Sequence, residues 1–120
     1  MYKLLVSLAV TSFFSLPAFA DSPEVLIDEA NSLVLTGFEM AELSASSRSE
    51  DVAQCMAMMD EHQPQSEALR TRIAALPYSV SKSNLDMAAI DLRRCLSCVP
   101  DALSSCEAAE KLIDTAEQYL

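Results

Sequence analysis

Residues 22–42 read SPEVLIDEANSLVLTGFEMAE and form the clearest amphipathic pattern in the chain. Ser22 and Pro23 are typical of a helix N-cap and first turn, and Glu24 is favourable at the positive end of the helix dipole. At about 100° per residue, the apolar side chains share one broad arc. These residues are Leu26, Ile27, Ala30, Leu33, Val34, Gly37, Phe38, Met40 and Ala41. The stretch predicts a helix that ends near residue 45 and packs this arc against other helices.

The opposite arc of the same helix is polar and rich in carboxylates. Four of them are candidates for an interaction face, namely Asp28, Glu29, Glu39 and Glu42. Gly37 lies at the middle of the apolar arc. Glycine inside a helix costs about 1 kcal/mol relative to alanine. We therefore expect another helix to approach closely at Gly37.

The rest of the chain repeats this helical pattern. We expect helices over residues 48–62, 65–76, 83–97 and 100–120, with Pro64 either bending one helix or separating two. Ser47 to Glu50 fits a capping box. The side chains expected to point inward include Val52, Met56, Leu103 and Leu120. With a single glycine in the whole chain, hairpin-rich β structure is disfavoured. The predicted fold is all-α, a small antiparallel bundle of four to five helices.

The segment before this bundle resembles a secretory signal peptide. Lys3 precedes an apolar run that is too short to span a bilayer, and Ala18-Phe19-Ala20 is typical of a cleavage site. We expect residues 1–20 to be removed, which leaves residues 21–120 as a single domain. The expected location is the periplasm or the outside of the cell, with no membrane insertion after cleavage.

Export determines how the four cysteines are interpreted, because disulfides persist in oxidising compartments. A helical hairpin between the last two helices would place Cys95 opposite Cys106 and leave Cys98 in the loop to reach Cys55. The competing pattern pairs Cys55 with Cys95 and Cys98 with Cys106. Geometry favours the first pattern. Cys95 and Cys98 also form a Cys-x-x-Cys motif. This motif lies near the C-terminal end of a helix, where the helix dipole disfavours a reactive thiolate.

Charge restricts the class of partner. Without Lys3, the chain has 7 basic and 18 acidic residues, a net charge of −11. Such a surface repels polyanions, so nucleic acid is an unsuitable partner and a cationic protein is a suitable one. An acidic surface also keeps a small protein soluble.

One alternative chemistry is present in the pattern. Cys55, Met59 and His62 share one helix face, and thiolate, thioether and imidazole ligands together suit copper(I). Catalytic chemistry has little support: His62 is the only histidine, and neither a nucleophile motif nor a cofactor fingerprint accompanies it.

The sequence therefore predicts a small acidic exported protein that works by binding rather than by turnover, such as an inhibitor, an immunity-type protein or an accessory subunit. It is not expected to be an enzyme or to need a cofactor. The alternative is a protein that handles copper or exchanges thiols through Cys55, Met59, His62, Cys95 and Cys98.

Overall fold

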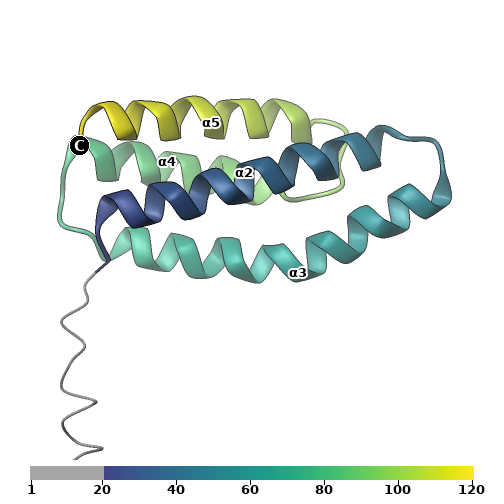
Figure 1. Cartoon of the computed structure of the whole chain (residues 1–120), viewed down its shortest axis with the longest axis horizontal. Helices are drawn as coiled ribbons and strands as arrows, with labels where there is room; N and C mark the ends of the chain where they lie inside the picture. The colour runs from purple at the N-terminus through teal and green to yellow at the C-terminus, as the bar shows by residue number, and fades with distance from the viewer. Residues whose placement is uncertain (1–20) are drawn as a thin grey trace, which may run out of the picture.

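The computed structural model describes residues 21–120, so the predicted signal segment lies outside the described residues. The described chain forms four helices joined by short loops and contains no strand (Figure 1). The helices are α2 (Pro23–Ala45), α3 (Ser49–Ala74), α4 (Val80–Cys95) and α5 (Ala102–Gln118). The predicted all-α bundle is confirmed, with four helices.

Consecutive helices run in opposite directions, which gives an up-down-up-down topology (Figure 1). α2 packs against each of the other three helices, and α4 also packs against α3 and α5. α3 and α5 lie at opposite corners and have no close backbone approach among the described residues. The outer sides of α2 and α4 therefore face opposite sides of the molecule.

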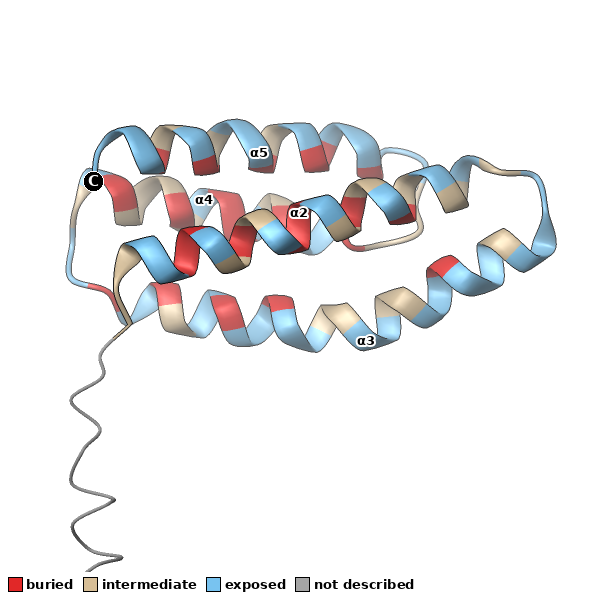
Figure 2. Ribbon diagram, viewed as in Figure 1, coloured by how far each residue is buried: buried red, intermediate tan, exposed pale blue. Residues whose placement is uncertain are grey.

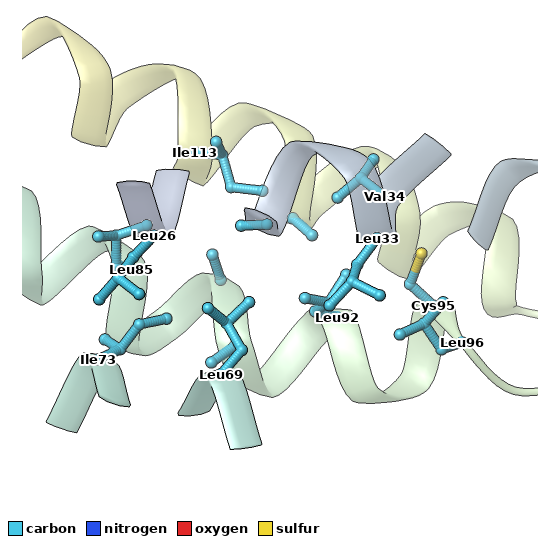
Figure 3. Packing of buried hydrophobic residues seen from close by; sticks show 14 of the residues in the cluster. Leu26, Leu33, Val34, Leu69, Ile73, Leu85, Leu92, Cys95, Leu96 and Ile113 are labelled. Carbon is cyan, nitrogen blue, oxygen red and sulfur yellow. The ribbon is translucent and has the colours of Figure 1, made fainter. Parts of the chain in front are cut away.

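The core lies between the four helices. Each helix is buried on the side that faces its neighbours and exposed on the other (Figure 2). Side chains from all four helices are directed toward one another in the interior (Figure 3). The largest fully buried ones are Leu26, Met40, Leu69, Ile73, Leu85, Leu92, Leu96 and Ile113. Burial of each contributes about 1.5–3 kcal/mol, so this core is the main source of stability.

α3 continues through Pro64, so of the two alternatives at this proline the structure has the single helix. Proline lacks the N–H that would bond to the carbonyl of Asp60, and the ribbon of α3 changes direction partway along its length (Figure 1). The helix persists because buried residues on both sides of Pro64, such as Cys55 and Leu69, belong to the same core. Next to the proline, the Gln63 amide donates to the carbonyl oxygens of Arg93 and Leu96 at the end of α4.

Three helix starts differ from the expectations. The capping box at Ser47 is wrong: Arg48 is the N-cap of α3 and makes no side-chain cap bond. α4 begins at Val80 rather than near residue 83, because the Ser79 hydroxyl accepts a hydrogen bond from the Lys82 N–H. α5 begins at Ala102, with Asp101 as its N-cap.

Four apolar side chains expected in the core are instead exposed: Val52, Met56, Leu103 and Leu120. α2 and α3 have 23 and 26 residues, whereas α4 and α5 have 16 and 17, so the α2–α3 hairpin projects beyond the α4–α5 loop (Figure 1). Val52 lies in this projection, where no helix from the other pair covers it. Leu120 follows the end of α5.

Candidate functional site

Two buried disulfides join the helices near the α4–α5 loop. Cys95 is bonded to Cys106 and Cys55 to Cys98, which is the pairing favoured by the sequence. The first bond links α4 to α5, and the second links α3 to the loop between them. Cys55, Cys95 and Cys106 are completely buried, and Cys98 is partly exposed. Such bonds persist in oxidising surroundings, so they indicate an exported protein.

Gly37 of α2 packs directly on the Cys95–Cys106 bond. A Cβ atom at position 37 would lie 2.1 Å from Cys95 Sγ and 2.9 Å from Cys106 Sγ. Cys55 Sγ lies 3.4 Å from the carbonyl oxygen of Met40, one turn further along α2. The close approach expected at Gly37 is confirmed, and the partner is a disulfide together with the end of α4. The sulfur atoms thus hold the C-terminal half of α2 in a fixed position.

The opposite end of α2 is held by charge. The Arg72 guanidinium, on the last turn of α3, donates to both carboxylate oxygens of Asp21 at 2.7 and 3.0 Å and also to Glu29. These hydrogen bonds lower the pKa of the Asp21 carboxyl and raise the pKa of Arg72. All three side chains are about one-third to two-fifths exposed, at 34–42%. The pairing belongs to the surface of the bundle.

The candidate interaction face on α2 divides in two. Asp28, Glu39 and Glu42 are exposed, and Leu35 lies among them with 69% of its surface exposed. Glu29, which was expected on the same outward arc, instead turns toward α3 and pairs with Arg72. The periodicity of α2 does not predict this pairing, because it carries no information about the position of α3 beside α2. Glu24, on the first turn of the helix, is also exposed.

A second row of carboxylates extends this face, and it was missed by the sequence analysis. On α5, spacings of three and four residues place one exposed stripe along the helix. It consists of Leu103, Glu107, Glu110, Asp114 and Glu117. Leu103 lines a groove with Ala41 and Ala45, which shows that the stripe begins on the side of α5 that adjoins α2. We name Glu24, Asp28, Glu39, Glu42 and the four α5 carboxylates the α2–α5 acidic face.

None of these eight carboxylates has an ion-pair partner among residues 21–120. Lys111 is the only cation on α2 or α5, and the other basic residues within positions 21–120 lie on α3, on α4 or in the loop before α3. The described molecule is therefore strongly polarised. Unneutralised carboxylates at an exposed surface create a negative potential that attracts cations over roughly the Debye length, about 8–10 Å at physiological salt.

An apolar groove lies at one end of the acidic face. Its walls are Ala41, Ser44 and Ala45 of α2 on one side and the segment Cys98–Pro100 with Leu103 on the other. Its volume is about 430 Å³. The small side chains of α2 leave this space open beside the α4–α5 loop. A groove of this size can accept one or two apolar side chains of a partner.

The residues of the copper alternative do not come together as a ligand set. The Cys55 sulfur is bonded to Cys98 and so supplies no thiolate. Met59 packs against the core, and His62 Nδ1 lies 3.0 Å from the side-chain oxygen of Gln65. Within residues 21–120, no group of three histidine, cysteine or acidic side chains is arranged to hold a metal. Cys95 and Cys98 likewise belong to different disulfides, so the Cys-x-x-Cys spelling does not form a dithiol pair.

Comparison with protein-family models, with curated proteins and with solved structures gives no significant match for this chain. Across residues 21–120, each helix is too short or too polar to cross a membrane.

Proposed function

We propose that this protein is an exported binding module whose α2–α5 acidic face binds a cationic protein. The observation that carries the proposal is the set of eight exposed carboxylates on two adjacent helices, none of which has an ion-pair partner within the described chain. Neutralising these charges in the folded state would reduce their mutual repulsion. A basic partner supplies that neutralisation and gains rapid, electrostatically steered association.

The scaffold behind the face supports binding rather than turnover. Gly37 and the two disulfides fix α2, α4 and α5 relative to one another, so the face loses little conformational freedom when a partner binds. The groove beside Leu103 would take an apolar side chain of the partner at the edge of the charged surface. The charged face then raises the rate of association, and the groove contributes to the specificity of binding.

The proposal includes the location of the protein. Residues 1–20 direct export, signal peptidase cleaves after Ala20, and the domain works in the periplasm. The two disulfides support an oxidising compartment. The intact mass of the exported protein tests this step: we expect a chain that begins at Asp21 with four fewer hydrogens than the reduced chain. A mass that still includes residues 1–20 would contradict it.

The binding step is tested with two variants that raise the net charge by the same amount. The face variant combines Asp28→Asn, Glu39→Gln, Glu110→Gln and Asp114→Asn. The control variant combines Glu50→Gln, Asp60→Asn, Glu61→Gln and Glu67→Gln, all on α3 and all exposed. Proteins from a periplasmic extract are bound to the immobilised oxidised protein and eluted with salt, and the association rate of the purified partner is then measured with each variant.

We expect the face variant to associate about tenfold more slowly at low salt, and the difference to disappear near 0.5 M NaCl because of screening. The control should remain within about twofold of the unmodified protein. Equal slowing in both variants would mean that net charge alone matters and that the α2–α5 face has no special role. An unchanged rate in the face variant would place the interface elsewhere.

A further inference from the structure

The outward side of α4 carries an apolar stripe that no helix of the bundle covers. Val80, Met87 and Ile90 are 51%, 46% and 61% exposed. With Ser83 and Arg94 they follow a spacing of three, four, three and four residues, so all five lie on one line along the helix. This is the pattern of a helix that packs lengthwise against another helix.

The stripe also lies on the side of the molecule where electrostatic repulsion between two copies of the protein is weakest. α4 has three cations (Lys82, Arg93 and Arg94) and two carboxylates, whereas α2 has five carboxylates and no cation. α2 and α4 lie on opposite sides of the bundle, so the stripe faces away from the α2 carboxylates of the α2–α5 acidic face. A second copy of this acidic protein can approach the α4 side with less electrostatic cost than any side that includes α2 or α5.

We propose that the protein forms a two-fold dimer in which α4 packs antiparallel against α4 of a second copy. The two-fold axis passes beside the midpoint between Met87 and Ile90. Met87 of each copy then packs against Ile90 of the other copy. Ser83, which is small, then lies opposite the long side chain of Arg94. The contact is isologous, so it closes at two copies and leaves no free stripe for further growth.

Charge complementarity supports this arrangement over other occupants of the stripe. Asp86 and Arg93 flank the stripe on the same side of α4, the side that adjoins α3. In an antiparallel pair related by a two-fold axis, residues on one side of the stripe meet residues on the same side of the partner helix. Asp86 of each copy therefore meets Arg93 of the other. On the opposite side, Asn84 meets Asp91, which can accept a hydrogen bond from the amide.

The groups that form these pairs are available on the surface. The Asp86 side chain is 42% exposed and the Arg93 side chain 63% exposed. Asp86 already accepts a hydrogen bond from Lys82, and Arg93 lies 3.4 Å from Glu67. Both intramolecular contacts are at the edge of the stripe, so each charged group can bridge its own neighbour and its partner in the second copy.

The expected dimer is weak. Stable interfaces bury about 1,200–2,000 Å² in total, and a single pair of 16-residue helices with three apolar side chains each lies below that range. We expect a dissociation constant of roughly 0.1 mM. The oxidised protein should therefore be monomeric at about 5 µM and mainly dimeric at about 1 mM in sedimentation velocity at physiological salt.

Two point variants test the stripe. Ile90→Lys should keep the protein monomeric at 1 mM, whereas Leu35→Lys, a matched change at an equally exposed apolar position on α2, should leave the dimer intact. Both positions are exposed, and circular dichroism verifies that both variants fold. A wild-type protein that remains monomeric at 1 mM would overturn the proposal. So would loss of the dimer in Leu35→Lys, or species larger than a dimer.

A charge exchange tests the antiparallel geometry independently of stability. Asp86→Lys alone places two basic residues at each predicted contact, and Arg93→Glu alone places two acidic ones, so each variant should be monomeric. Mixed together, the two variants restore both opposite-charge contacts and should form a heterodimer. Failure of the mixture to form a heterodimer while the wild type dimerises would overturn the antiparallel arrangement.

Discussion

At one end of the bundle α2 is held by buried sulfur, and at the other end by a partly exposed guanidinium. Gly37 lies against the Cys95–Cys106 bond, where neither cysteine has any exposed surface. Asp21 and Glu29 hold Arg72 across the surface, where water reaches all three groups. The difference separates two kinds of constraint. The first resists pH and salt but requires an oxidising environment, and the second depends on ionisation and is screened by salt.

Loss of the disulfides should lower the free energy of unfolding more than any change at the charged end of α2. The bonds close loops with sequence separations of 43 and 11 residues. Loop-closure entropy predicts stabilisation of about 4 kcal/mol for Cys55–Cys98 and about 3 kcal/mol for Cys95–Cys106. We expect the paired alanine variants to lower the free energy of unfolding in that order, measured by urea denaturation. A smaller loss for the Cys55–Cys98 variant would show that native packing outweighs chain entropy at this end.

Gly37→Ala should have the next largest effect. Its new Cβ would lie 2.1 Å from Cys95 Sγ, so the helix or the disulfide must move. We expect a loss of about 1–3 kcal/mol, in spite of the higher helix propensity of alanine. Repeating the substitution in the Cys95→Ala/Cys106→Ala variant removes the two sulfur atoms and should reduce that loss to less than about 1 kcal/mol. Equal losses in both backgrounds would mean that the sulfur contact is not the cause.

Substitution at the charged end should have a smaller effect at neutral pH. Arg72→Met removes the contacts with Asp21 and Glu29, and the methionine retains most of the apolar stem of the side chain. Arg70→Met is a matched control, because Arg70 is exposed and has no ion pair within the described chain. We expect Arg72→Met to lower the melting temperature more than Arg70→Met in low salt. The gap should narrow in 1 M NaCl. Identical melting temperatures would assign no stabilising role to the pairing.

The response to acid should be the smallest of these effects. Hydrogen bonds from Arg72 depress the pKa of Asp21 in the folded protein. The associated stability is present above the unfolded pKa of about 3.9 and is lost as the pH falls through the lower, folded value. Asp101 has a pKa depressed in the same direction by Arg94, so it contributes with the same sign. Asp21→Asn should remove only part of the decrease in stability below about pH 4, because Asp101 still contributes. The measurement is the melting temperature as a function of pH. An unchanged acid profile would contradict a role for Asp21.

Local periodicity was sufficient to predict most of the fold. The apolar arc of α2 and the position of Gly37 within it follow from residue spacing, because helix geometry depends on the chain a few residues away. The disulfide pairing was favoured for the same reason: two helices joined by a short loop place Cys95 beside Cys106. Pro64 was less informative. A bent helix and two separate helices have almost the same local pattern, and the shared core selected the bent one.

The candidate site could be predicted only in part. Asp28, Glu39 and Glu42 are exposed as the α2 pattern indicates, but Glu29 pairs with a residue 43 positions away. The α5 carboxylates joined the face because α5 packs beside α2, and no property of α5 alone specifies its neighbour. Val52 and Leu103 fit apolar arcs yet are exposed. Val52 lies where the α2–α3 hairpin extends past the shorter helices, and Leu103 faces the small side chains of Ala41 and Ala45, which leave a groove.

The sequence by itself determined the helices, their buried sides, the excess of negative charge and an even number of cysteines, since each depends on composition or on contacts within a few turns. Only the tertiary structure decided which charged rows adjoin, which sulfur atoms meet Gly37, and which apolar side chains remain outside the core. These outcomes depend on the relative length and position of whole helices. Packing between distant segments sets both, and no local pattern in the chain encodes that packing.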